Sequence, residues 1–147
     1  MEAVDLSWNQ VLEQIKELGL KIKKDNFKPD ILIGMIRGGL VPTRMLSKEL
    51  GCNDIYCLRV RYVKKGKERT RNVRIIHGLN VDLTNNKVLI VDEIADSGET
   101  LRLVTDYIKF FNPSEIKTAV IHLKETSKFN PDYFLVKVNK WVNYPWD

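Results

Sequence analysis

Hydrophobic and polar residues follow two different spacings along this chain, and each spacing predicts one kind of element. After Ser7, which forms a capping-box pattern with Gln10, apolar residues recur at helical spacing up to Gly19, where we expect the first helix to end. A second helix is expected over residues 42–50, because Gly51 supplies a typical C-terminal stop.

Six apolar runs have the length and residue types of strands, and they occupy residues 31–33, 55–62, 73–76, 87–91, 119–123 and 133–138. A third helix follows the fourth run after a polar turn and keeps its apolar residues on one face. Strands that alternate with helices in this way indicate an α/β domain with a mainly parallel sheet flanked by helices. No repeat or linker interrupts the chain, so we expect a single domain over residues 1–147.

Composition narrows the class of protein further. The chain has 147 residues, 24 basic and 19 acidic, and its formal charge of +5 favours an anionic partner, either a phosphorylated small molecule or a nucleic acid. No leader pattern or membrane-spanning run is present, so we expect a soluble, cytoplasmic protein. Cys52 and Cys57 lack the spacing and histidine partners of a zinc site.

The polar turn after the strand at 87–91 holds most of the candidate chemistry. Two adjacent acids come first, and small or hydroxyl-bearing residues lead into the helix; the candidates are Asp92, Glu93, Ala95, Asp96, Ser97, Gly98, Glu99 and Thr100. Free backbone N–H groups and the helix dipole favour a phosphate at such a helix N-terminus. Taken singly, these residues could merely end a strand or cap a helix. The complete string predicts a monophosphate site beside acids that ribose hydroxyls and a magnesium ion would satisfy.

A glycine-rich turn at residues 34–39 ends another predicted strand. Its glycines let backbone amides approach an anion closely, and Arg37 adds a delocalised positive charge. Ligands of open parallel sheets bind at the carboxyl ends of the strands. Both turns should therefore border one crevice, although 55 residues separate Arg37 from Asp92. A tight turn before a helix is the simpler explanation of the glycines alone.

Residues 88–100 closely resemble the phosphoribosyl-pyrophosphate-binding signature of type I phosphoribosyltransferases. The resemblance covers almost the whole chain and implies the fold of that family, with a core at about 1–125 and a small hood mainly at 126–147. It implies that the two adjacent acids hold the ribose hydroxyls and that the following turn grips the 5′-phosphate. Arg37 and Gly38 resemble the pyrophosphate loop of the xanthine-guanine enzymes, whose Arg-Gly peptide is often cis.

The C-terminal stretch resembles the hood of the enzymes of this family that act on 6-oxopurines. By that resemblance Trp141 stacks on the purine, Lys124 donates to the 6-oxo group and the Val142 carbonyl lies near the 2-position. An indole face suits a flat heterocycle, and a lysine favours an oxo acceptor over an amino group. Asn143 stands where some relatives carry an acid, which leaves the recognition of a 2-amino group open.

The resulting hypothesis is a magnesium-dependent transfer of the 5-phosphoribosyl group from 5-phosphoribosyl-1-pyrophosphate to hypoxanthine or guanine, with xanthine as a further acceptor. Arg37 would stabilise the departing pyrophosphate, and Asp96 would take or share the purine proton near N7. The resemblance implies Asp92, Glu93 and Asp147 as metal ligands and a homodimer as the assembly. The product would be a purine nucleoside 5′-monophosphate, made in purine salvage.

A rival hypothesis is a nucleic-acid-binding regulator with this fold, since fold alone does not define function. Its contacts would come from a basic run that contains Lys64, Lys65, Lys67, Arg69, Arg71 and Arg74. The same run could instead be a solvated hairpin tip, or it could close over the pyrophosphate. A third alternative keeps the transferase chemistry but uses adenine or a pyrimidine as the acceptor.

Overall fold

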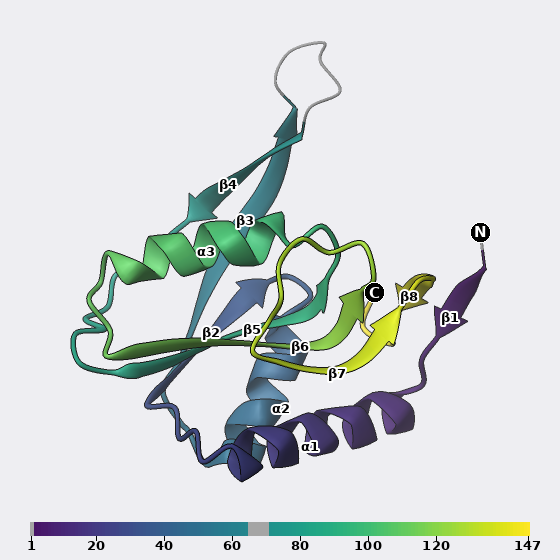
Figure 1. Ribbon diagram of the computed structural model, residues 1–147, viewed down its shortest axis with the longest axis horizontal. Coiled ribbons are helices and arrows are strands. Elements are labelled where there is room, and N and C mark those ends of the chain that lie inside the picture. The colour runs from purple at the N-terminus through teal and green to yellow at the C-terminus, as the bar shows by residue number, and fades with distance from the viewer. Residues whose placement is uncertain (1, 65–70) are drawn as a thin grey trace.

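The computed structural model describes residues 2–64 and 71–147, and these form a large sheet with helices on both faces and a small sheet at one end (Figure 1). The elements in chain order are β1 Ala3–Asp5, α1 Trp8–Lys24, β2 Ile31–Ile36, α2 Leu40–Leu50, β3 Ile55–Lys64, β4 Arg71–His77, β5 Lys87–Ala95, α3 Glu99–Lys109, β6 Glu115–Lys124, β7 Tyr133–Val138 and β8 Trp141–Asn143.

The large sheet has the strand order β4-β3-β2-β5-β6-β7. Every neighbouring pair is parallel except β3 and β4, which form an antiparallel hairpin at one edge. The expected α/β architecture with a mainly parallel sheet is therefore confirmed. Strands β2 and β5 lie side by side at the centre, so the turns that follow them leave the sheet at the same rim.

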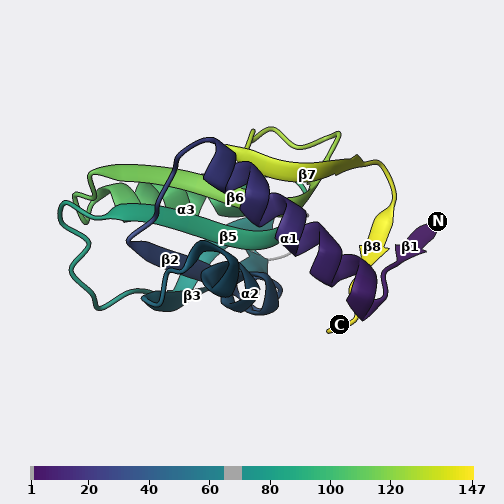
Figure 2. The same ribbon diagram turned by 90° about the horizontal axis from the view of Figure 1, so that it is seen from below.

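The core has two layers, one on each side of the sheet. Helices α1 and α2 cover one face and α3 covers the other (Figure 2). Strand β5 shows how the sequence supplies both layers: Leu89 and Val91 pack toward α1 and α2, whereas Val88 and Ile90 pack toward α3. All four are fully buried, as expected for a central parallel strand, whose two faces are both covered.

The helix ends differ in how well local sequence predicts them. The Ser7–Gln10 capping box forms as expected, and α2 ends at Gly51 with a φ of 65°. Helix α1, however, continues past Gly19 to Lys24. Gly19 is buried against α2, and a Cβ built there would lie 3.0 Å from the Cβ of Glu49. This glycine permits close helix packing, so the expected stop was wrong.

Both candidate turns are shorter than the sequence predicted, because the strands before them run further. Strand β5 continues to Ala95, with Asp92 aligned to Val120 of β6, so both adjacent acids belong to the strand. Strand β2 continues to Ile36, and Gly34 lies inside it, where a Cβ would come within 2.6 Å of the Thr43 hydroxyl. Sheet hydrogen bonds therefore hold the backbone that carries Asp92 and Glu93.

The small sheet joins the two ends of the described chain. Strands β1 and β8 pair in parallel, with Ala3 opposite Trp141 and Asp5 opposite Asn143. Neither strand was predicted, since three residues are too few to show a periodicity. Strand β7 belongs to the large sheet, and the chain turns away from it to reach β8 (Figures 1 and 2).

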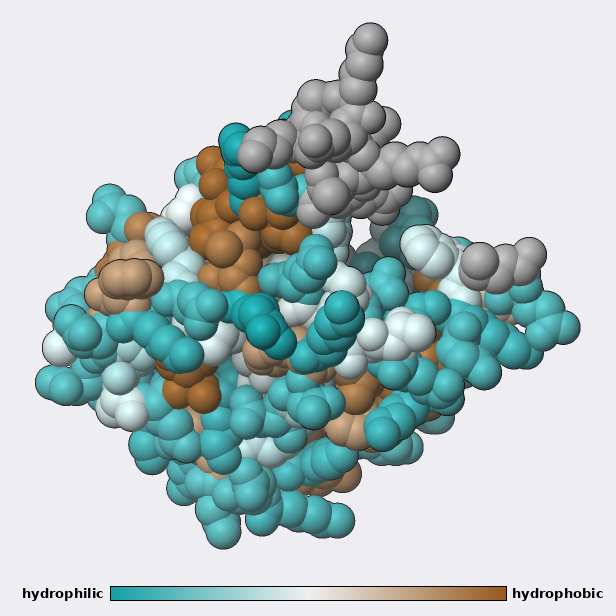
Figure 3. Space-filling view, turned by 45° about the horizontal axis from the view of Figure 1, so that its top comes forward, coloured by the Kyte–Doolittle hydropathy of each residue, from teal (hydrophilic) through white to brown (hydrophobic). Residues whose placement is uncertain are grey.

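Most of the visible surface is polar or charged (Figure 3), as expected for a chain that buries its apolar residues. Figure 3 shows a mostly hydrophilic face on which the main hydrophobic patch lies near the top of the view. Among the described residues, no helix has the length and apolar character needed to cross a bilayer. Lys65, Lys67 and Arg69 of the basic run lie outside the described residues.

Candidate active site

Three cavities meet at the carboxyl ends of β2, β5 and β6, and each of them is lined in part by Glu93. The first also holds the glycine-rich turn, the second the tip of β8, and the third the start of α3. The two turns that the sequence singled out thus border one continuous site. The topology explains this, since β2 and β5 are adjacent and parallel.

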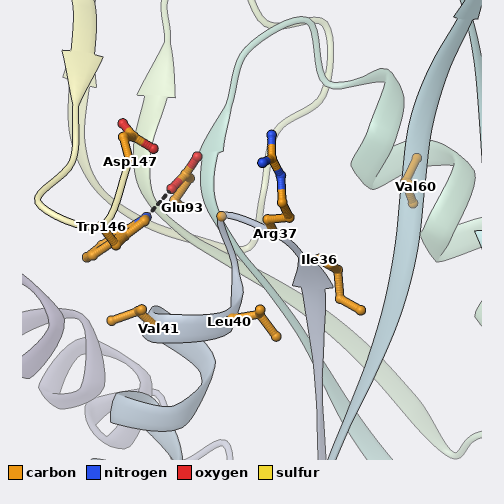
Figure 4. Close-up of a pocket in the computed structure, with 9 residues that line it drawn as sticks. Ile36, Arg37, Leu40, Val41, Val60, Glu93, Trp146 and Asp147 are labelled. Atoms are coloured by element: carbon orange, nitrogen blue, oxygen red, sulfur yellow. Dashed lines mark hydrogen bonds between the residues drawn. The ribbon is translucent and has the colours of Figure 1, made fainter.

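The first cavity, of about 660 Å³, lies between the glycine-rich turn and the end of the chain (Figure 4). Arg37 lies on one side of it and Glu93 and Asp147 on the other, and Gly38 lies directly against Glu93. Gly38 permits this approach, because a Cβ at that position would lie 2.2 Å from the Glu93 carboxyl. The cavity combines one guanidinium with two carboxylates, which suits a phosphate group bound together with a cation.

The same turn contains a cis peptide bond between Ile36 and Arg37. The resemblance had implied this geometry for the next bond, between Arg37 and Gly38, so the expected position is corrected by one residue. The turn closes through the Gly39 N–H, which donates to the Met35 carbonyl oxygen at 2.8 Å.

The third cavity, of about 180 Å³, surrounds the start of α3. Its lining contains seven of the eight residues expected there, namely Asp92, Glu93, Ala95, Asp96, Ser97, Gly98 and Thr100. The eighth, Glu99, is exposed and does not line the cavity, although its N–H donates to the Ser97 hydroxyl at 3.2 Å. Tyr62 of β3 completes the wall, with its hydroxyl 3.3 Å from that of Ser97.

The second cavity, of about 300 Å³, brings together Lys124, Trp141 and Val142, the three residues expected to bind the base. The Lys124 ammonium donates to the Lys140 carbonyl oxygen, which fixes the end of this long side chain at the cavity. Asp96 lines this cavity as well as the one at α3. It therefore lies between the cavity expected to hold the base and the cavity expected to hold the sugar phosphate.

The adjacent acids have unusual electrostatics. Burial raises the pKa of the Asp92 carboxyl to about 8, against the opposing hydrogen bond that it accepts from the Glu93 N–H at 2.8 Å. Burial also raises the pKa of Glu93, and the charge of Asp147 adds to this, whereas Trp146 and Arg37 oppose it. A bound cation or sugar hydroxyls would compensate both acids in the ionised form.

The site suits a magnesium ion that is held by only a few protein ligands. In the part of the chain that the structure describes, no three histidine, cysteine or acidic side chains gather closely enough to hold a metal ion, so Asp92, Glu93 and Asp147 do not form one cluster. Magnesium commonly uses one or two carboxylates, several waters and the phosphates of the substrate. Glu93 and Asp147, which line two of the cavities together, suit that pattern.

Two aromatic residues of the site were not predicted from the sequence. The Trp146 indole N–H donates to the Glu93 carboxylate at 2.7 Å, and the Tyr144 hydroxyl donates to the Glu93 carbonyl oxygen at 3.3 Å. The two rings stack, with centroids 4.9 Å apart. Trp146 packs on the core and also orients the acid. The Pro-Trp-Asp sequence at residues 145–147 was the available signal.

An α/β fold with three adjoining cavities and an arginine-bearing glycine turn at the carboxyl ends of its strands is typical of proteins that form or bind nucleotides. The model of the phosphoribosyl transferase domain matches residues 6–147. The chain belongs to the phosphoribosyltransferase family, and the type I fold expected from the sequence is confirmed.

Several relatives are similar over nearly their whole length. The chain is 27% identical to a xanthine-guanine phosphoribosyltransferase of Nitratidesulfovibrio vulgaris, over 97% of this chain and 83% of that one. A purine phosphoribosyltransferase from Pyrococcus horikoshii Ot3 superposes with a TM-score of 0.90 at 35% identity, covering 100% of this chain and 95% of the other. A Neisseria gonorrhoeae protein with bound ppGpp also gives a TM-score of 0.90, at 27% identity and with 99% and 89% coverage.

Proposed function

We propose that this protein transfers the 5-phosphoribosyl group from 5-phosphoribosyl-1-pyrophosphate to a 6-oxopurine, releasing pyrophosphate and forming the nucleoside 5′-monophosphate. The observation that carries the proposal is the position of Asp96, which lines both the cavity at α3 and the cavity at Trp141. A bond made between C1′ of a sugar phosphate and a ring nitrogen of a base would form beside this carboxylate. The names of the relatives support the same reaction.

The chain's own residues account for the binding of the donor. The 5′-phosphate would lie at the N-terminus of α3, where the amides of residues 97–100 and the Ser97 and Thr100 hydroxyls can donate to it. Glu93 and Asp92 would accept from the ribose hydroxyls. Arg37 would face the pyrophosphate from across the first cavity and stabilise the charge that develops on it as the bond at C1′ breaks.

The reaction also needs a proton acceptor and a cation. Asp96 would accept the proton of the purine near N7, a role worth about 10²–10⁴-fold in rate. Magnesium, held by Glu93 and Asp147 together with substrate phosphates, would supply charge neutralisation at the leaving group. Burial raises the pKa of Asp92, so its carboxyl carries less negative charge near neutral pH. It would therefore bind a ribose hydroxyl with less need for a neighbouring cation.

The acceptor base follows from the residues of the second cavity. Lys124 has donors and no acceptor, so it suits the 6-oxo group of hypoxanthine, guanine or xanthine and not the amino group of adenine. Trp141 is exposed at the mouth of this cavity and offers its ring face. The 6-oxopurines therefore remain the proposed acceptors.

An activity assay tests the proposal directly. The protein would be incubated with 5-phosphoribosyl-1-pyrophosphate, magnesium and each nucleobase in turn, and nucleotide formation followed by chromatography. We expect product with hypoxanthine or guanine, dependent on magnesium. Turnover with adenine or uracil alone would overturn the base assignment, and the absence of turnover with every base would overturn the reaction.

The rival hypothesis of a nucleic-acid-binding regulator receives no support from the relatives, all of which are named as enzymes where they have a functional name. The proposal extends to a homodimer that acts in the cytoplasm in purine salvage. Light scattering at several protein concentrations would measure the assembly, and a monomer at micromolar concentration would contradict that part.

A further inference from the structure

The small sheet places the N-terminal strand beside the proposed purine site. Strand β1 pairs with β8 so that Asp5 lies opposite Asn143, and the N–H of Leu6 donates to the Asn143 carbonyl oxygen at 3.0 Å. Figures 1 and 2 show the two short strands side by side at the end of the molecule. Asp5 and Asn143 are 138 positions apart in the sequence, yet they are hydrogen-bonded neighbours, and Asn143 lines the second cavity.

The side chains at this edge form a continuous chain of hydrogen bonds. The Trp141 indole N–H donates to Asn143 Oδ1 at 2.8 Å, and Asn143 Nδ2 donates to Asp5 Oδ1 at 2.7 Å. Chemistry permits only this orientation of the amide, because an indole nitrogen can only donate and an ionised carboxylate can only accept. Both polar atoms of Asn143 are thus committed, one to the tryptophan and one to Asp5.

Packing alone does not hold the tryptophan. Trp141 is 55% exposed and is absent from the two core clusters, so packing restrains its ring only partly. Its N–H is the single polar group through which the ring orientation can be fixed. A stacking residue that is ordered before the base arrives avoids the loss of side-chain entropy on binding.

We propose that Asp5 and Asn143 are positioning residues of the purine site, which hold the Trp141 indole in the orientation that stacks on the base. The inference rests on the proposed function, because the base is the acceptor of that reaction. The N-terminal strand is then part of the substrate site and does more than close the small sheet. It also explains an amide at position 143, since a carboxylate there would face Asp5 with like charge.

Exchanging the amide and the carboxylate between positions 5 and 143 tests this arrangement. In Asn143→Asp the tryptophan keeps an acceptor, but the new carboxylate meets Asp5 and repels it. In the double variant Asp5→Asn with Asn143→Asp, the carboxylate at 143 accepts from the indole N–H and from the amide at position 5, so both hydrogen bonds are restored and only the bond between positions 5 and 143 changes direction. Asn112→Asp is the matched control, because Asn112 is exposed just before β6, at the opposite end of the sheet.

Steady-state kinetics supply the first readout. We expect Asn143→Asp to raise KM for hypoxanthine about fivefold to tenfold with little change in KM for 5-phosphoribosyl-1-pyrophosphate, a loss of order one hydrogen bond. The double variant should return to within about twofold of the parent protein. The control should match the parent in both constants. A role confined to holding β1 on β8 would instead lower the melting temperature and leave the two KM values unchanged.

A second readout needs no substrate. NMR measures how fast the Trp141 indole proton exchanges with solvent, and the signal is assigned from its loss in Trp141→Phe. We expect faster exchange in Asn143→Asp and recovery in the double variant. Equal exchange in all variants, an unchanged KM for the base, or a double variant as impaired as the single one would overturn the inference. If the exchange pattern appears while the parent protein turns over no oxopurine, the proposed reaction fails and the ordering of the indole by Asp5 and Asn143 stands.

Discussion

The end of β5 and the β1–β8 edge bound the same site, yet they are built in different ways. Asp92 and Glu93 extend a strand whose preceding residues are fully buried and paired on both sides. Trp141 lies on a three-residue strand with one short partner and is more than half exposed. The first region is positioned by the core, and the second by a few hydrogen bonds at the surface.

The difference indicates which part of the reaction each region controls. A rigid strand end suits the sugar phosphate and the departing pyrophosphate, because misplacement near the breaking bond is costly. A lightly held aromatic edge suits a base that must enter and leave. Substitutions at the end of β5 should therefore change the rate of the chemical step, whereas those at β8 should change the affinity for the base.

The largest expected effect comes from Asp96→Asn, which removes the proposed proton acceptor but keeps the size of the side chain. We expect kcat to fall about 10²–10⁴-fold, with KM for 5-phosphoribosyl-1-pyrophosphate within a few-fold of the parent value. Asp106→Asn on the exposed face of α3 is the control and should keep full activity. Unchanged turnover in Asp96→Asn would remove the assigned role.

A smaller effect, on binding and not on rate, is expected from Trp141→Ala. Loss of a stacking ring costs about 1–3 kcal/mol per base, which is roughly fivefold to 150-fold in KM for the purine. Phe110 at the end of α3 is highly exposed and lines none of the three cavities, so Phe110→Ala provides the control variant. A fall in kcat with an unchanged KM for the base would contradict the division of labour between the two regions.

A comparison of two glycines separates the effect of backbone strain from the effect of close packing at the start of α3. Gly98 has a φ of 85° and would place a Cβ 2.4 Å from that of Phe129, whereas Gly51 has a φ of 65° and open space around it. Gly98→Ala should lose about 2–5 kcal/mol of unfolding free energy from strain and overpacking. Gly51→Ala should lose about 1–2 kcal/mol from strain alone. Urea denaturation measures both, and equal losses would contradict the packing at Phe129.

The pH dependence of stability gives the smallest expected change, since two buried groups oppose each other. Burial lowers the pKa of His122 to about 4, so the unfolded chain binds more protons between pH 4 and 6.5 and stability rises with pH there. Burial raises the pKa of Asp92 to about 8, so the folded protein keeps a proton that the unfolded chain loses, and stability falls with pH between about 4 and 8.

Burial also raises the pKa of Glu93, which adds a fall of stability with pH, so we expect a gentle fall below pH 6.5 and a clearer fall above it in the metal-free protein. His122→Gln should steepen the fall below pH 6.5, and Asp92→Asn should remove most of the fall above it. Denaturant midpoints measured at several pH values test this. A profile that His122→Gln leaves unchanged would show that the imidazole is accessible to protons in the folded protein.

Local sequence predicted the elements that carry a strong period or a specific stop. The capping box at Ser7, the stop at Gly51 and the buried strand of β5 were all found where expected. The motif at residues 92–100 was specific enough to identify the family, because its acids, glycine and hydroxyls form a fixed order with one chemical purpose. Glu99 belongs to the same motif but is exposed and does not line the third cavity.

Other features depended on contacts that no local pattern encodes. Gly19 reads as a helix stop, but the approach of Glu49 from α2 makes it a packing residue. The hydrogen bond from Trp146 to Glu93 spans 53 positions, and that from Asn143 to Asp5 spans 138. Such partners become visible only when the strands that carry them are placed in order.

By itself the sequence determined the α/β class, the two turns and most residues of the third cavity, because each depends on spacing or on groups that are neighbours in the chain. The tertiary structure alone decided that β5 continues through the acids, that both chain ends form one edge, and that Asn143 and Trp146 orient other side chains. Those features follow from the pairing of strands that are distant in the sequence. That pairing depends on contacts throughout the fold, which no local pattern of residues encodes.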